Sequence, residues 1–393
     1  ISYPLKFITT KKGKNMTAVL QNKDTANGNT LYMALELSNK KWKLVFSDGA
    51  RYRIKSIDAG NWAVLLDEIN QAREKFRLPV GCRIASCYEA GRDGFWIDRA
   101  LKAAGIENLV VDSSSIEVSR RRKQVKTDRV DVKALLRLLM RYHHGEKAAL
   151  RGIRVPEICA EDQRRINRER ERLIKERGAH SARIKSLFKL HGINLERMSE
   201  FPTLIQTAKG AVTGYDLPVD LKLELQREYQ RYQLVDQQIK AIEKEQVERV
   251  AEGDQLGLQK INHLRTLKGL GWQSSWVLIM EFFNWRNFSN AKQLGSCAGL
   301  TPTPYDSGDS TREQGISKAG NKRIRKVMIE LSWLWLRYQP DSVLSRWFET
   351  RFGRGGKRMR RIGIVALARK LLIALWRYLE HGVLPEGAIL KAI

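Results

Sequence analysis

The stretch LYMALELSNKKWKLVFSDGARYRIKSI, residues 31–57, decides the fold of the first part of the chain. Three runs rich in aliphatic and aromatic residues, LYMALELS, KWKLVFS and RYRIKSI, are separated by short polar segments that contain Asn39 and Gly49. Runs of this kind, bounded by turn-forming residues, are typical of strands joined by tight turns. The stretch therefore predicts a three-stranded meander.

Alternating helix and strand signals follow the meander. The predicted elements are a helix in NWAVLLDEINQARE (61–74), a buried strand in CRIASCYEA (82–90), a helix in GFWIDRALKAAG (94–105), a strand in NLVVDSS (108–114) and a helix in DRVDVKALLRLLMRY (128–142). Three strands followed by helix, strand, helix, strand and helix is the order of ribonuclease-H-like folds, in which a sheet carries helices on its faces. We therefore predict an α/β domain of this class.

Composition restricts the function. The chain of 393 residues has 71 Lys and Arg against 43 Asp and Glu, a formal net charge of +28, and 42% hydrophobic residues. This hydrophobic content indicates globular domains, and the length suffices for two or three of them. The cationic excess favours a polyanionic partner, with nucleic acid as the first candidate and an anionic membrane as the competitor. Because no apolar run has the length of a membrane span and no signal peptide precedes the first strand, we expect a soluble cytoplasmic protein.

The cysteines and the N-terminal tail give no functional signal. Four scattered cysteines, without a CxxC pair or nearby histidines, indicate neither a zinc site nor a disulfide framework, and we expect them to be reduced: Cys82, Cys87, Cys159 and Cys297. Residues 1–29 are polar, and we assign them no function. We expect Met16, not Ile1, to be the initiating residue.

Beyond the tail we predict three parts: an α/β catalytic domain at 30–150, a helical or coiled-coil region at 151–255 and a mainly helical domain at 256–393. In the second part, LKLELQREYQRYQLVDQQIKAIEKEQVERV (221–250) carries a partial heptad seam that Glu228 and Gln246 interrupt. The seam fits an intramolecular helical hairpin or a coiled-coil arm that makes dimers.

Glycine and proline mark the segments around these helices. FPTLIQTAKGAVTGYDLP (201–218) has the composition of a linker. In LRTLKGLGWQSSWVLIMEF (264–282), a glycine-x-glycine turn between helices is similar to a helix-hairpin-helix, where Gly269 and Gly271 would leave backbone N–H groups free to meet a phosphate. We therefore count both glycines as candidates for nucleic-acid binding.

The final part contains two further polar segments. A predicted loop of small and polar residues, followed by a basic helix, lies in CAGLTPTPYDSGDSTREQGISKAGNKRIRK (297–326), and its candidate chemical group is Ser307. The alternative is that Ser307 is a turn residue beside Gly308. RFGRGGKRMRR (351–361) places six cationic side chains ahead of an amphipathic helix, and a solvated surface is its simplest interpretation.

Four carboxylates converge in the predicted α/β domain. Asp128 and Asp131, in KTDRVDVKAL (126–135), share one face of a helix at its N-terminus, although helix capping alone would also explain Asp128. Glu36 ends the first strand, and Glu89 ends the buried strand, where apolar neighbours would make an unpaired carboxylate costly. Magnesium prefers oxygen ligands, and two ions about 4 Å apart can stabilise the attacking and leaving oxygens of a phosphodiester. We therefore predict a site for two Mg²⁺ ions and phosphoryl chemistry.

Several motifs in the right order resemble the DEDD transposases of bacterial insertion sequences, the one-ten family with its eleven-eleven subgroup. They are LELSNKKWKL, YEAGRDGFWIDRAL, KTDRVDVKALL, LKGLGWQSSWVLIMEF, and AGLTPTPYDSG followed by ISKAGNKRIRK, and the resemblance covers nearly all of residues 30–380. It implies a RuvC-like resolvase domain whose acids are Glu36, Glu89, Asp128 and Asp131. The first family position is usually aspartate; the longer Glu36 can still ligate magnesium.

The resemblance also implies a serine nucleophile. Ser307 would attack DNA and form a covalent phosphoserine link while acid-bound magnesium polarises the phosphate. A serine hydroxyl requires a metal or a base for activation, and no histidine is near Ser307 in the sequence. Ser296 and Ser310 serve as controls. The alternatives are a metal-dependent, resolvase-like nuclease in which water is the nucleophile, and an inactive nucleic-acid-binding relic.

The implied partners are donor and target DNA, an element-encoded guide RNA that pairs with both, and further copies of the chain in a dimer or tetramer. We expect the protein to be associated with the nucleoid. Recognition of phosphate and shape would leave sequence specificity to base pairing. The candidate phosphate contacts are Arg120, Arg121, Arg122, Lys123, the arginines from Arg164 to Arg172, and Lys318, Lys322, Arg323 and Arg325.

Overall fold

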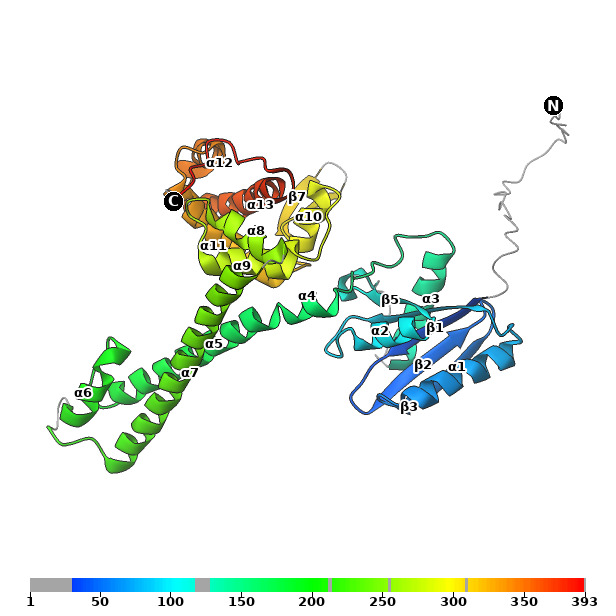
Figure 1. Ribbon diagram of the computed structural model, residues 1–393, viewed down its shortest axis with the longest axis horizontal. Helices are drawn as coiled ribbons and strands as arrows, with labels where there is room; N and C mark the ends of the chain where they lie inside the picture. The colour runs from blue at the N-terminus through cyan, green and yellow to red at the C-terminus, as the bar shows by residue number, and fades with distance from the viewer. Residues whose placement is uncertain (1–29, 117–127, 211–213, 254–255, 308–309, 392–393) are drawn as a thin grey trace. The chain divides into compact units, whose positions relative to one another are not determined.

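The computed structural model describes residues 30–116, 128–210, 214–253, 256–307 and 310–391. The chain divides into two compact units, residues 1–155 and 156–393. Each unit has hydrophobic clusters of its own, and each is described here by itself. The two units differ in architecture, the first being mixed α/β and the second mainly helical (Figure 1).

The first unit is built on a five-stranded sheet with the order β3-β2-β1-β4-β5 (Figure 1). Its strands are β1 (Thr30–Glu36), β2 (Lys41–Ser47), β3 (Tyr52–Asp58), β4 (Arg83–Glu89) and β5 (Glu107–Val111). The first three form the predicted antiparallel meander, whereas β4 pairs parallel to β1 and β5 pairs parallel to β4. Its turn at Gly49 has a φ of +100°, a conformation that favours glycine.

Helices cover both faces of this sheet. They are α1 (Trp62–Phe76), α2 (Trp96–Ala103) and α3 (Asp128–His143), with a short η2 (Ser113–Ser115) after β5. Along β1, Leu31, Met33 and Leu35 pack with α1 and α2, while Tyr32 and Ala34 pack with α3. Both faces of the strand are therefore buried, which explains its continuous apolar run. The predicted order of strands and helices is confirmed.

The second unit begins with a helical hairpin. Its elements are α4 (Ile158–Asp162), α5 (Arg165–Lys189), η3 (Met198–Glu200), α6 (Phe201–Thr207) and α7 (Val219–Glu252), and α5 packs along α7. The buried seam of α7 includes Leu225, Val235, Ile239 and Ile242. Because α5 of the same chain covers this seam, the structure shows the intramolecular helical hairpin, the first of the two predicted alternatives.

The polar interruptions of the seam are paired within the chain. Glu228 is 5% exposed and accepts hydrogen bonds from His180 Nδ1 at 2.7 Å, from Arg183 at 2.9 Å and from Arg231 at 2.7 Å. Gln246 accepts one from Gln273 Nε2 at 2.8 Å. The Glu228 carboxylate is thus fully paired, whereas Gln246 is paired through its oxygen and its buried Nε2 has no hydrogen-bond partner among the described residues; α7 continues through both positions.

The segment 201–218 is more ordered than its linker-like composition predicted. It contains α6, and Phe201, Ile205 and Leu217 join the cluster of buried residues at this end of the hairpin. The apolar residues spaced along FPTLIQT provide a helical face that glycine and proline counts overlook. The linker prediction is therefore wrong for the described part of this segment.

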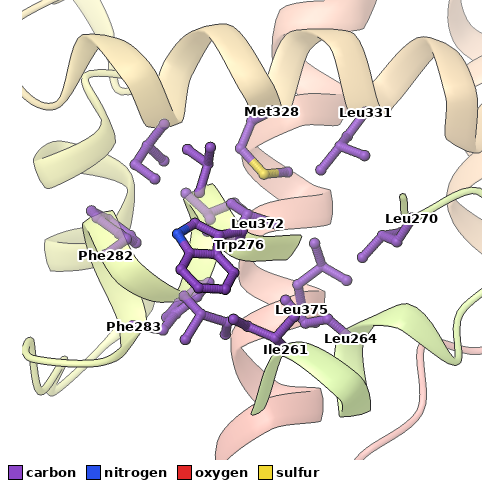
Figure 2. Close-up of a cluster of buried hydrophobic side chains, with 14 of the residues drawn as sticks. Ile261, Leu264, Leu270, Trp276, Phe282, Phe283, Met328, Leu331, Leu372 and Leu375 are labelled. Atoms are coloured by element: carbon purple, nitrogen blue, oxygen red, sulfur yellow. The ribbon is translucent and has the colours of Figure 1, made fainter. Parts of the chain in front are cut away.

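The remaining elements form a helical body with one small hairpin of strands. They are α8 (Leu256–Arg265), α9 (Trp272–Leu278), η4 (Ile279–Phe283), α10 (Ala291–Ala298), β6 (Pro302–Ser307), β7 (Ser310–Ile316), α11 (Lys322–Tyr338), α12 (Val343–Phe348), η5 (Glu349–Gly353) and α13 (Lys357–His381). Trp276 of α9, Met328 of α11 and Leu372 of α13 meet in its core (Figure 2). None of the helices in the described ranges combines the length and the apolar character needed to cross a membrane.

Candidate active site and nucleic-acid interface

Two of the predicted acids lie at the ends of neighbouring parallel strands. Leu35 of β1 pairs with Tyr88 of β4, and Glu36 and Glu89 are the next residues along. Parallel strands lie about 4.8 Å apart, so the two backbones meet at one edge of the sheet. Side chains alternate along a strand, which places both acids on the same face as Ala34.

Helix α3 covers that face and brings Asp131 to the same edge. The Cys87 thiol lies 4.0 Å from the Leu135 carbonyl oxygen, and the rings of Tyr32 and His143 lie 5.9 Å apart. The end of α3 thus covers the start of β1, and its beginning lies toward the strand ends. From Cys87, two residues along β4 advance about 6.6 Å, and one helical turn back from Leu135 covers about 6 Å. Glu89 and Asp131 are therefore at the same level.

The exposure of these acids corrects one sequence argument. Glu89 is exposed, and Glu36 and Asp131 are partly buried. The prediction that Glu89 ends among apolar neighbours is wrong, because the strand leaves the core at Tyr88, which is fully buried. Solvent, and with it a polar substrate, has access to this edge.

The donor chemistry fits magnesium, but the described residues do not form a closed metal cage. Asp128 begins α3 one turn before Asp131, and its side chain lies outside the described residues. Among the side chains that are described, no group of three or more Asp, Glu, His or Cys residues lies close enough to hold a metal ion. Carboxylate oxygens are nevertheless the ligands that magnesium prefers. Glu36, Glu89 and Asp131 thus provide oxygen donors toward one edge of the sheet, but the three do not by themselves form a metal site among the described residues.

A fifth acid at this edge escaped the sequence analysis. Val111, the last residue of β5, pairs with Glu89, and Asp112 directly follows the strand. Asp112 is partly buried, and its backbone N–H donates to the Arg151 carbonyl at 2.8 Å. The sequence did contain a signal for this residue, since Asp112 directly follows the predicted strand run NLVV. The carboxyl ends of parallel strands lie at one edge of the sheet, so an acid at that position is expected near Glu36 and Glu89.

Ser307 belongs to the second unit. It is the last residue of β6, and its backbone pairs with Ser310 of β7. The predicted loop is therefore a β-hairpin, and Ser307 lies beside its tip. Gly308 and the side chain of Ser307 lie outside the described residues. Of the two control serines, Ser310 faces Ser307 across the hairpin, and Ser296 lies in α10.

The glycine turn between α8 and α9 packs inward. Gly269 has a φ of +95°, and a Cβ there would lie 3.2 Å from the Tyr338 Cβ. The Gly271 N–H donates to Ser274 Oγ at 3.2 Å, and the Ser275 N–H donates to the Gly271 carbonyl. The prediction that Gly271 leaves its N–H free for a phosphate is therefore wrong. The turn between two helices is confirmed.

Several arginines predicted to grip phosphate have partners within the protein. Arg164 is 6% exposed and stacks on Trp285, with its guanidinium 4.9 Å from the ring centroid. Arg168 donates two hydrogen bonds to Glu281, at 2.6 and 2.8 Å, and this pairing raises the pKa of Arg168. Arg170 donates to Glu243. These side chains connect α5 to its neighbours, while Arg165 and Arg172 are exposed.

The predicted basic group from Lys318 to Arg325 also contains both residues that are bonded within the protein and residues that are exposed. Arg323 donates to Glu171 at 2.7 Å, and Arg325 donates to the carbonyl oxygens of Ala298 and Lys318. Lys318 and Lys322 are exposed. The group Arg120, Arg121, Arg122 and Lys123 lies outside the described residues.

Comparisons with known proteins identify the family. Residues 261–346, from α8 into α12, match the model of the "Transposase IS116/IS110/IS902 family". The Sinorhizobium fredii protein y4rJ, which is named as a transposase, is 39% identical over 378 residues, covering 92% of this chain and 94% of that protein. The transposase for insertion sequence element IS1111A of Coxiella burnetii is 25% identical over 311 residues, 77% of this chain and 79% of the relative. That for IS1328 of Yersinia enterocolitica is 26% identical over 223 residues, 55% and 62% respectively.

These matches make the protein a transposase, an enzyme that processes DNA. The chain belongs to the IS110/IS116 family of insertion-sequence transposases. The family predicted from the motifs is thereby confirmed. The family model includes the glycine turn and Ser307, and the match to y4rJ extends over nearly the whole chain.

Proposed function

We propose that this transposase excises and inserts its element by magnesium-dependent strand cleavage and exchange through a covalent phosphoserine–DNA intermediate. The observation that supports the proposal is that the register of β1 and β4 and the packing of α3 direct Glu36, Glu89 and Asp131 toward one edge and one face of the sheet. We assign the first unit to the RuvC-like class. Its strand order and the position of α3 support that assignment.

In the proposed reaction, Glu36, Glu89 and Asp131, together with Asp128, would hold magnesium. Bound there, magnesium would polarise the scissile phosphate and stabilise its developing charge. Ser307 Oγ forms a bond to phosphorus as one phosphorus–oxygen bond of the DNA strand breaks. The serine proton passes to solvent, and the departing strand oxygen gains a proton. A strand hydroxyl then attacks the same phosphorus and releases the serine, so the number of phosphodiester bonds is conserved.

The acids and the serine belong to different units, so the reaction requires both units to meet on DNA. They can come from one subunit or from two subunits of a dimer or tetramer. We further propose membership of the eleven-eleven subgroup and a bridging guide RNA encoded by the element. The exposed Lys318, Lys322 and Arg172 remain candidates for contacts with either nucleic acid.

The serine assignment is tested with end-labelled element DNA and denaturing electrophoresis, which retains only covalent protein–DNA adducts. Ser307→Ala should abolish the adduct and leave DNA binding unchanged, whereas Ser310→Ala should retain the adduct. An adduct in the Ser307→Ala variant would refute the assignment. Cleavage without any adduct in the parent protein would favour the nuclease alternative, for which the exposure of Glu89 gives water access. Absence of cleavage with magnesium and matching RNA would favour an inactive relic.

A further inference from the structure

The six cations of residues 351–361 form a surface on one small part of the second unit, hereafter the 351–361 cluster. Every one of these side chains is exposed: Arg351, Arg354, Lys357, Arg358, Arg360 and Arg361. Among the described residues, no hydrogen bond or ion pair joins any of the six side chains to an acid. They differ in this from Arg168, Arg170 and Arg323, which are bonded to carboxylates.

Two chain segments are held together to make the cluster. Arg351 belongs to η5, Arg354 follows it, and the other four cations occupy the first turns of α13. Gly363 allows α13 to approach η5, because a Cβ at that position would lie 2.5 Å from the Phe352 ring. Phe348, Phe352, Ile364 and Leu367 form a buried cluster of their own beneath the cations. The backbone that carries the cations is therefore held in place by this buried apolar cluster.

The arrangement is unfavourable for the protein alone. The first turn of α13 contains no acid, and its three cations, followed by Arg361, oppose the positive end of the helix dipole. Lys357 and Arg361 are four residues apart on the helix, a spacing at which like charges repel. Glu349, at the start of η5, is the acid nearest to these cations in the sequence, and no Asp or Glu follows from Thr350 to Leu379 to offset the remaining charge. An external polyanion would remove this repulsion.

We propose that the 351–361 cluster binds the phosphate backbone of duplex DNA. The exposed apolar side chains in and beside it, Met359 and Ile362, are not aromatic, and Phe352 is buried. The cluster therefore lacks the stacking surface that single-stranded nucleic acid uses. Arginine and lysine side chains that are not paired with acids provide phosphate contacts that position a duplex and do not read its bases. This surface is separate from the proposed catalytic residues and does not depend on the serine chemistry.

The test measures binding of the full-length protein to a 30-base-pair duplex of arbitrary sequence by fluorescence anisotropy. EDTA is present, so that failure of catalysis cannot affect the result. In the test variant, Lys357, Arg358, Arg360 and Arg361 are each changed to Gln. We expect the slope of log affinity against log salt to become shallower by about three to four, since each phosphate contact contributes about 0.9.

Two further proteins serve as controls. The first changes four exposed cations of the helical hairpin to Gln: Lys175, Lys189, Lys209 and Arg227. Its slope should change by less than about one. The second replaces Arg358, Arg360 and Arg361 with Lys, and it should keep the parent slope because the charge is retained. An unchanged slope in the test variant, or an equal change in the hairpin control, would overturn the proposal. Loss of binding to a structured RNA with duplex binding intact would also overturn it.

Discussion

The ion pair between Arg168 and Glu281 attaches the helical hairpin to the helical body, and Glu281→Gln should destabilise the second unit. Glu281 is 1% exposed in η4, and Arg168 of α5 binds it through two hydrogen bonds of 2.6 and 2.8 Å. Arg323 of α11 lies 4.0 Å from the same carboxylate. The substitution preserves the shape of the side chain and removes its charge.

The expected loss in the free energy of unfolding is about 2–3 kcal/mol. Hydrogen bonds to a charged group contribute about 1.5–3 kcal/mol each. The glutamine oxygen can still accept one of the two bonds, and the Arg168 side chain, 40% exposed, can be hydrated when it loses its partner. The value therefore falls below the roughly 3–5 kcal/mol typical of breaking a fully buried pair.

Arg170 and Glu243 provide the matched control. This pair also starts from α5, but the Glu243 side chain is 40% exposed. An exposed ion pair contributes at most about 1 kcal/mol and weakens with salt, so Glu243→Gln should have a small, salt-dependent effect. Urea unfolding followed by circular dichroism compares the two. Equal losses for the two variants would refute the reasoning that burial of the carboxylate sets the magnitude.

Three other predictions follow from the geometry. Asp131→Asn should lower magnesium-dependent DNA cleavage at least about 100-fold with DNA binding unchanged, measured on labelled element ends. Burial raises the pKa of Glu228, but hydrogen bonds from His180 and Arg183 outweigh this effect and leave the pKa below its usual range. The stability that Glu228 contributes is therefore present above about pH 4.3 and is lost as the pH falls through the lowered pKa. Hydrogen exchange of α5 and α7, measured as a function of pH, would detect this loss. Gly269→Ala should cost about 1–2 kcal/mol in urea unfolding because of its φ of +95°, whereas Gly178→Ala, in a helix with open space around it, should stabilise by about 0.5–1 kcal/mol.

The α/β domain was predictable because its signals are local. The runs from β1 to β3 are separated by Asn39 and Gly49, and the later strands alternate with helices that have clear apolar faces. The β6–β7 hairpin was missed since Pro302 and Pro304 in PTPYDS are unusual in strands. Its register also shifts between these two prolines, a local irregularity that residue composition does not reveal.

The positions of the acids were also largely predictable, but their environments were not. Strand order puts Glu36 and Glu89 at one edge, and the direction of α3 adds Asp131. Exposure depends on where each strand leaves the core, and this separates Glu89 from the fully buried Tyr88 beside it. Composition and hydrophobic periodicity are evaluated over several residues, so neither can locate a change from buried to exposed that takes place between two adjacent residues.

Net charge was the least informative signal about individual residues, because ion pairs join segments far apart in the sequence. Arg168 and Glu281 are separated by 113 positions, and Arg323 and Glu171 by 152. An arginine in a basic segment can therefore be fully used in holding helices together. The cations of 351–361 have no such partners among the described residues; this segment is as rich in cations as 164–172 but lacks acids such as Glu169 and Glu171. A shortage of acids close to the cations in the sequence, with Glu349 alone beside 351–361, distinguishes a surface available to DNA from one that stabilises the fold better than the number of cations does.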